Sequence, residues 1–188
     1  MVMDQEKIIG PVRHWVETVV VGLNLCPFAK RELVNNRVRF AVSEAETEEQ
    51  LLVDLQAELE VLNHEEAVET TLLIHPGVLQ DFFDYNQFLN SVDWLLAQAG
   101  LEGVYQVASF HPGYQFSGTR PDDVENYTNR SPYPVLHLIR EESLERAIAS
   151  HPDPEGIPGR NIELLESLGR ERMQALLQAC YGLAEAGE

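Results

Sequence analysis

Basic residues are scarce in this sequence. Lys and Arg number 13 among 188 residues, against 31 Asp and Glu, which gives a formal net charge of −18 at pH 7. Such a charge repels the phosphate backbone of a nucleic acid and an anionic membrane surface alike. We therefore expect neither nucleic acid nor a membrane as a partner, and we interpret the acidic side chains mainly as a solubilising surface.

Long apolar runs and paired cysteines are also missing. The longest apolar run, VVVGLNL, is far shorter than the roughly 20 residues that span a bilayer, and the start MVMDQEK lacks the apolar stretch of a signal peptide. The two cysteines, Cys26 and Cys180, are far apart and form no CxxC motif, so the sequence indicates neither a disulfide framework nor a cysteine-based metal site. We expect a cytoplasmic protein whose cysteines are both reduced.

The common catalytic motifs are absent as well. No HExxH, Walker A, GxSxG or GxGxxG pattern occurs, so the sequence gives no support to the hydrolases, kinases and dinucleotide enzymes that these motifs define. The length and the 44% hydrophobic content suffice for one well-buried core, and we expect a single globular domain over residues 1–188.

What the chain does contain is a repeated tripeptide, His-Pro-Gly. It occurs at residues 75–77 and 111–113, each time after an apolar run typical of a strand, with a helical apolar stripe between the two copies. The pattern predicts a β-α-β unit with strands at about 68–74 and 104–110. The two strands would be parallel and would end at one edge of the sheet, where open α/β sheets bind ligands.

Two further strands are expected, at 38–42 and 135–139. The predicted fold is a single three-layer α/β domain with a small, mixed, mostly parallel sheet of about four strands flanked by helices. An α+β arrangement with an antiparallel fourth strand is the alternative. Between the third and fourth strands lies a segment rich in Gly, Pro, Asn, Asp and Tyr, residues 111–134, and loops of that length in compact domains usually carry function.

Two helix starts have a clear local pattern. Thr47 with Gln50 three residues later forms a capping box. Pro27 suits the first position of a short helix that runs to about Val34, which makes Cys26 its expected N-cap.

The repeated motif supplies the first candidate site. His75 and His111 would act as general acid and base groups or as metal ligands, and Asp122 could complete a set of two histidines and a carboxylate for a divalent metal such as zinc. The alternative is structural: each histidine caps its strand end and bonds a backbone carbonyl.

Two other groups of residues are candidates. Cys26, followed by Lys30 and Arg31, has the setting that lowers a thiol pKa and makes a nucleophile or a ligand, but its apolar neighbours favour a buried inert thiol. In the long loop, Arg130 with its neighbours Asn129 and Tyr127 would bind the acidic group of a substrate, or would tie the loop to backbone carbonyls instead. His137, inside an apolar strand, is interpreted as a hydrogen-bonded core residue.

Several long blocks resemble one bacterial family. The segments GLNLCPFA, DFFDYNQFLN, ASFHPGYQF and NYTNRSPYPVLHLIRE, together with the first His-Pro-Gly, are similar to the family known as domain of unknown function 1415. The resemblance covers nearly the whole chain. It implies no activity, cofactor or catalytic residue.

The leading functional hypothesis is a small enzyme that acts on an anionic small molecule, a carboxylate or a phosphate, in a cleft lined by His, Arg and Cys at the strand ends. No cofactor is required by this hypothesis, and a divalent metal is the alternative. The other hypotheses are a non-catalytic module that binds a metabolite or a metal, and a protein-interaction adaptor with an exposed apolar surface.

Overall fold

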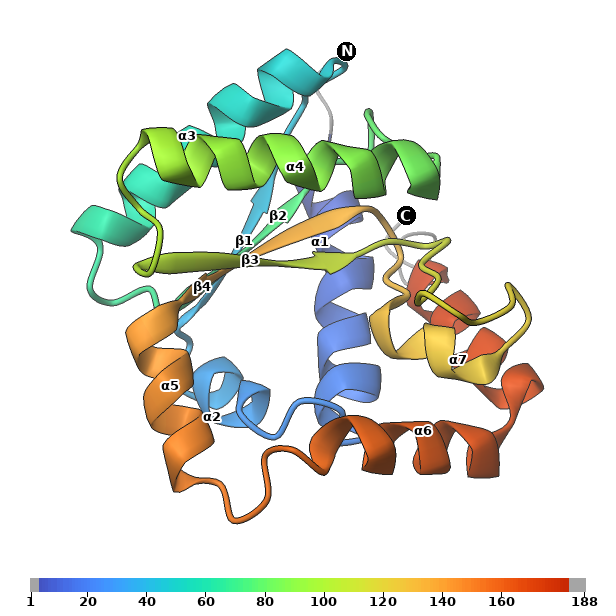
Figure 1. The fold of residues 1–188 in the computed structure, drawn as a ribbon. Coiled ribbons are helices and arrows are strands. Elements are labelled where there is room, and N and C mark those ends of the chain that lie inside the picture. The colour runs from blue at the N-terminus through green and yellow to red at the C-terminus, as the bar shows by residue number, and fades with distance from the viewer. Residues whose placement is uncertain (1–3, 183–188) are drawn as a thin grey trace.

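Four strands form one mixed sheet in the computed structural model, which describes residues 4–182 (Figure 1). The strands are β1 (Val38–Val42), β2 (Thr70–Ile74), β3 (Tyr105–Phe110) and β4 (Val135–Arg140), and their order across the sheet is β1-β2-β4-β3. β1 is parallel to β2, whereas β4 is antiparallel to both of its neighbours. The predicted α/β class with a mixed sheet is confirmed, and the alternative of an antiparallel fourth strand describes β4.

Helices cover both faces of the sheet, so the predicted three layers are present (Figure 1). One face carries α3 (Glu48–His64) and α4 (Phe82–Gln98). The other carries α1 (Gln5–Trp15), the π-helical turn η1 (Val16–Val21), α2 (Ala29–Val34), α5 (Glu141–Ser150), α6 (Ile157–Leu168) and α7 (Arg170–Tyr181), with the short 3-10 helix η2 (Val124–Asn129) beside α6.

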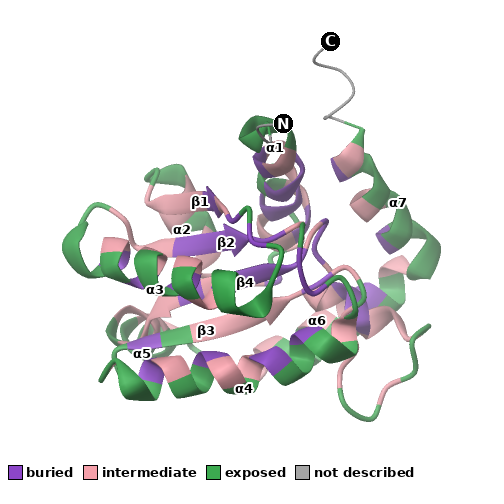
Figure 2. Cartoon of the chain, turned by 90° about the horizontal axis from the view of Figure 1, so that it is seen from above, coloured by how far each residue is buried: buried purple, intermediate pink, exposed green. Residues whose placement is uncertain are grey.

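The strict alternation of side chains along β2 and β4 builds a core on each face. Leu73 packs in the core under α3 and α4, while Leu72 and Ile74 pack in the core of α1, α6 and α7 with Trp15 and Leu165. A strand buried on both faces has consecutive apolar residues, as in residues 72–74 of β2 and in most of β4. Figure 2 shows β2 as one of the most buried segments of the sheet.

The predicted β-α-β unit is corrected in one respect. β2 and β3 do run in the same direction and end at the same edge, but β4 lies between them, so they are not neighbours. Burial favours this order, because Val135, Leu136 and Leu138 of β4 are fully buried in the two cores that the helices cover, which suits a central strand. The long loop 111–134 gives the chain enough length to return between β2 and β3.

The predicted helix starts differ in outcome. The capping box is confirmed, because the Thr47 hydroxyl accepts a hydrogen bond from the Gln50 N–H, although the Gln50 side chain accepts from Glu46 instead. Cys26 is not an N-cap, since α2 begins at Ala29, after a turn in which the Cys26 carbonyl accepts from the Ala29 N–H. Within residues 4–182, no helix combines the length and the apolar character that a membrane span requires.

Candidate functional site

His75 and His111 lie on either side of Tyr85, at the ends of β2 and β3. Their ring centroids are 5.8 Å and 5.0 Å from that of Tyr85, and both imidazoles are buried. The Tyr85 hydroxyl donates to the Val135 carbonyl and accepts from the Phe110 N–H, which ties α4 to β4 and β3. The topology therefore brings the two predicted histidines into one aromatic cluster.

The ring nitrogens of these histidines bind the same loop. Nδ1 of His75 donates to the Val78 carbonyl at 3.0 Å, and Nε2 of His111 donates to the next carbonyl, that of Leu79, at 2.9 Å. Leu79 has a φ of +61°, a left-handed conformation that side chains rarely adopt without support. The hydrogen bonds therefore agree with the structural alternative, in which each histidine holds a backbone carbonyl.

Neither imidazole is prepared for proton transfer to a ligand. Burial lowers the pKa of His75 to about 4 and also lowers the pKa of His111, so both rings are neutral at pH 7. His111 has no nitrogen left over, because its Nδ1 accepts from the Gly113 N–H. Nε2 of His75 has no hydrogen-bond partner in the described part of the chain, but it is fully enclosed.

The predicted substrate-binding residues of the long loop bind the loop itself. Arg130 donates to the carbonyls of Tyr114 and Pro121, and its guanidinium lies 4.6 Å above the Tyr127 ring. The Asn129 amide donates to the Ser109 carbonyl. These contacts match the alternative role, which is to tie the loop to backbone carbonyls.

The proposed metal ligand set is not assembled. Asp122 forms an ion pair with Arg170 at 3.0 Å, at the surface. Within residues 4–182, no three His, Cys, Asp or Glu side chains come together in a way that could hold a metal ion. His75, His111 and Asp122 therefore do not form the predicted site.

Cys26 lies in a different place, in a cleft of about 590 Å³ between α2, α5 and the ends of β2 and β4. We call this the Cys26 cleft. Its polar lining consists of Cys26, Arg31, Glu32, Arg37, Glu69, Thr70, His137, Ser143, Arg146 and Ser150, and its apolar lining of Pro27, Phe28, Ile139, Leu144 and Ala147.

The Cys26 cleft and the predicted histidines are at opposite ends of β2. Thr70, which lines the cleft, is the first residue of β2, and His75 follows its last residue. Five residues of extended chain span about 16 Å. The expectation of one site that joins Cys26 to His75 and His111 is therefore wrong.

His137 projects from the middle of β4 to the wall of the Cys26 cleft. Its Nε2 lies 2.7 Å from the Thr70 hydroxyl oxygen, which is also 2.6 Å from the Leu138 carbonyl. A carbonyl can only accept, so the single hydroxyl hydrogen goes to Leu138 and the imidazole must donate its own Nε2–H to Thr70. Burial lowers the pKa of His137 to about 4, and the ring is neutral at pH 7. Its Nδ1 therefore has a free lone pair, which accepts no hydrogen bond from the described residues.

The Cys26 thiol is not the activated nucleophile that the sequence suggests. Burial raises its pKa, and this effect outweighs the hydrogen bonds from the backbone N–H groups of Phe28 and Ala29, which act in the opposite direction. The expectation of a lowered thiol pKa is therefore wrong. Cys26 contributes a neutral, polarisable side chain to the cleft.

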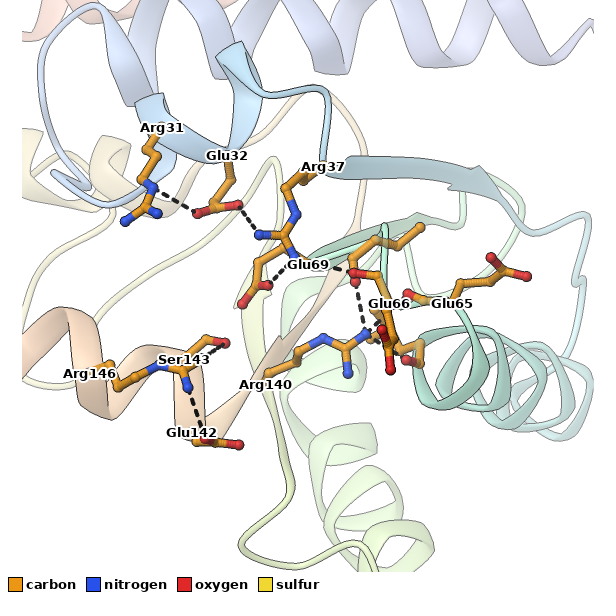
Figure 3. Close-up of polar contacts among 12 residues, drawn as sticks. Arg31, Glu32, Arg37, Glu65, Glu66, Glu69, Arg140, Glu142, Ser143 and Arg146 are labelled. Atoms are coloured by element: carbon orange, nitrogen blue, oxygen red, sulfur yellow. Dashed lines mark hydrogen bonds and ion pairs between the residues drawn. The ribbon is translucent and has the colours of Figure 1, made fainter.

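Three arginines come to the Cys26 cleft from different segments. Arg37 pairs with Glu69 at 2.9 Å and more loosely with Glu32 at 3.7 Å. Figure 3 shows this network, in which Arg31 of α2 is joined to Glu32, while Arg146 of α5 lies apart from it and contacts Glu142 and Ser143. Three arginines and two glutamates line the cleft, in a chain whose net charge is −18, and Arg146 also pairs with Glu142 of α5 at 2.8 Å.

A second cleft of about 600 Å³ continues from the first. The two clefts share Arg37, Glu69, Ser143 and Arg146. The second one is more polar and includes Arg140, whose Nη2 donates to the Leu62 and Val68 carbonyls near the end of α3. Arg140 is therefore fixed by backbone carbonyls, as Arg37 is in part through the Glu66 carbonyl.

The sequence points to two residues of this cleft, Cys26 and its neighbour Arg31, and not to most of its polar lining. It also shows His137, but predicts for it the role of a hydrogen-bonded core residue. A local signal was present, because Thr70 and His137 are polar residues within otherwise apolar strands. Arg37 and Arg146 carried no signal, since only the tertiary fold places them together.

The comparisons with known proteins name a family but no activity. A family model described as a protein of unknown function (DUF1415) matches residues 7–175. No curated protein and no solved structure matches the chain. The match confirms the resemblance predicted from the sequence blocks, and because it spans nearly the whole chain, the protein belongs to the DUF1415 family.

Proposed function

We propose that this protein binds a small organic anion, a carboxylate or a phosphate, in the Cys26 cleft. The observation that carries the proposal is the meeting of Arg31, Arg37 and Arg146 around one hollow in a chain with 13 basic residues and a net charge of −18. Guanidinium groups recognise carboxylates and phosphates through paired hydrogen bonds. The volume, about 590 Å³, is within the range of small-molecule sites.

The arginines have different parts in this proposal. Arg37 is held by Glu69 and Glu32, so it supplies a fixed positive charge. The Arg31 side chain is 82% exposed, and its ion pair with Glu32 is long, at 3.9 Å. Arg31 is therefore the guanidinium most free to turn to a ligand, while Arg146 reaches the same space from α5.

A second candidate function is catalysis on the bound anion, and His137 favours it. The unpartnered Nδ1 of this neutral ring can accept a hydrogen bond from the reacting group of a ligand, but a pKa of about 4 makes it a weak base at pH 7. Cys26 favours the non-catalytic version, because its raised pKa leaves the thiol protonated and no general base is hydrogen-bonded to it among the residues described. Both candidate functions require the cleft to bind an anion, so the experiments below test anion binding.

The two cysteines provide a direct test of occupancy. Cys26 lines the cleft, whereas Cys180 is fully buried in the core of α7. The rate at which iodoacetamide alkylates Cys26, measured by mass spectrometry, should fall when an anion occupies the cleft. Alkylation of Cys180 should be slow with or without ligand and serves as the internal control.

Arginine variants locate the binding. Arg31→Gln and Arg146→Gln should each weaken the binding of the protecting anion by about tenfold, the loss expected for a charge-assisted hydrogen bond. Arg172→Gln removes the same charge from an exposed position on α7 and should leave the affinity unchanged. If no anion in a broad panel of carboxylates and phosphates protects Cys26 at millimolar concentration, the proposed function is wrong.

A further inference from the structure

We infer that the anion bound in the Cys26 cleft carries a hydroxyl or amino group, and that Nδ1 of His137 accepts a hydrogen bond from it. The ligand class is then a hydroxy acid, an amino acid or a hydroxyl-bearing phosphate. This inference rests on the proposed function and makes it more specific. The observation behind it is that Nδ1 of His137 has no hydrogen-bond partner among the described residues.

The fold fixes which nitrogen of His137 faces the ligand. Thr70 gives its only hydroxyl hydrogen to the Leu138 carbonyl, so it can receive one from His137 and cannot donate to it. This arrangement selects the tautomer with hydrogen on Nε2. Nδ1 then keeps an unused lone pair on a residue that lines the cleft, and no described residue donates to it.

Glu32 Oε2 is also buried without a hydrogen-bond partner, but it belongs to a charged carboxylate. Other polar groups of the lining are donors, or acceptors that already have partners. The arginines have no acceptor atom. Glu69 accepts from Arg37, and the Ser143 hydroxyl accepts from Arg146 at 3.3 Å. Ser150 donates its hydroxyl hydrogen to the Ala147 carbonyl. His137 Nδ1 is therefore the neutral acceptor without a partner in this part of the described structure.

An anion without a hydroxyl or amino group would leave this part of the cleft, at Nδ1 of His137, without a hydrogen-bond donor. Its oxygens would satisfy the arginines but would place a lone pair against the lone pair of Nδ1. A ligand with a donor near its acidic group satisfies both. Sites built to hydrogen-bond a ligand group reject the analogue without it by at least about tenfold, because the protein's own polar atom is then left unpaired.

The experiment compares ligands that differ by a hydroxyl group. The pairs are lactate and propionate, malate and succinate, and glycerol 3-phosphate and propyl phosphate, each measured by calorimetry and by protection of Cys26. The hydroxylated member should bind at least about tenfold more tightly in at least one pair. The carboxylate and phosphate pairs show which acidic group the arginines prefer.

Two variants of His137 separate its two nitrogens. The Asn amide overlays the Nδ1 position of histidine, and the Gln amide overlays Nε2. His137→Gln should therefore keep the contact with Thr70 and lose the preference for the hydroxylated ligand, while the affinity for its partner without the hydroxyl stays the same. His137→Asn should retain the preference, and this rescue is not expected of a merely structural histidine.

The outcomes are distinct. If both members of every pair bind the wild-type protein equally, or if His137→Gln keeps the preference, this inference is overturned and anion binding stands. If no member of any pair binds or protects Cys26, the inference fails with these probes, and the broader anion panel then decides the proposed function separately.

Discussion

At the scale of single residues, three histidines with a lowered pKa differ in whether a ring nitrogen remains without a hydrogen-bond partner. His111 uses both ring nitrogens on the backbone. His75 leaves Nε2 free but sealed inside the protein, and His137 leaves Nδ1 free at a cleft. Of these three, His137 alone joins an unused nitrogen to a place that a ligand can reach, although the sequence favours the other two.

The burial of His75 predicts a loss of stability in acid. Its pKa is about 4 in the folded protein, below the ordinary value of 6.5 that it regains on unfolding. The unfolded chain therefore binds the proton more readily, and the free energy of unfolding falls as the pH drops from about 6.5 towards 4. Between pH 7 and pH 5 this one group should cost about 2 kcal/mol.

Urea denaturation at pH 7 and pH 5 measures this effect. His75→Asn keeps a donor for the Val78 carbonyl but does not titrate, so its stability should fall less than that of the wild type by about 2 kcal/mol. His64→Gln, which removes an exposed histidine from the end of α3, is the control and should follow the wild type. Equal losses in wild type and His75→Asn would contradict the prediction.

At this scale the candidate site was only partly predictable. The residues around Cys26 in the sequence single it out as a candidate site residue, and the structure places it in the lining of a cleft. The role of His137 depends on Thr70, which is 67 residues away, and on the direction of one hydroxyl hydrogen. No local pattern contains that information.

At the scale of elements, the two His-Pro-Gly motifs hold one loop in different ways. The histidines bind the adjacent carbonyls of Val78 and Leu79, so the repeat in the sequence is a pair of clamps in the structure. The glycines are not equivalent. A Cβ at Gly77 would lie 2.9 Å from the Ala45 carbonyl oxygen, whereas at Gly113 its nearest neighbours would be at ordinary van der Waals distance, 3.5 Å and beyond.

The two glycines therefore predict opposite tolerances. Gly77→Ala should destabilise the protein by about 1–3 kcal/mol, because a backbone oxygen cannot move away cheaply. Gly113→Ala should stay within about 1 kcal/mol of the wild type, since it gains from a stiffer unfolded chain. Chemical denaturation of both variants at pH 7 tests the pair, and equal effects would show that the close approach to Ala45 does not matter.

The positions of the strands along the chain were largely predictable from the sequence. The expected strand at 38–42 is β1, and the other three expected strands differ from the observed ones by one or two residues at an end. Apolar runs and turn residues are local, and they decide where a strand lies. The position of β4 between β2 and β3 was not predictable, because it depends on pairings such as Leu72 with His137, far apart in the chain.

At the scale of the whole molecule, the cleft lies at an unexpected end of the sheet. Three of the four strands end at the His75 and His111 edge, where α/β folds usually bind ligands, and there the aromatic cluster fills the space. The Cys26 cleft opens at the other end, where β4 finishes and β2 begins. The reversed direction of β4 is what carries His137 and Ile139 to that end.

The net charge should make the cleft selective for small anions over polyanions. A small carboxylate or phosphate that binds in the cleft would meet the guanidinium groups of Arg31, Arg37 and Arg146. An oligonucleotide of about a dozen residues would extend beyond the cleft, and its other phosphates would meet the surface of a molecule with a net charge of −18. Repulsion outside the site should then cancel attraction inside it.

Fluorescence anisotropy with labelled single- and double-stranded oligonucleotides tests this selectivity. At about 150 mM salt we expect no binding tighter than about 100 µM, the weak end of non-specific association, under conditions in which a small anion protects Cys26. A basic DNA-binding protein is the positive control. Tight binding that falls steeply with added salt would mean that the arginines serve a polyanion, and the acidic surface would then have to lie away from its path.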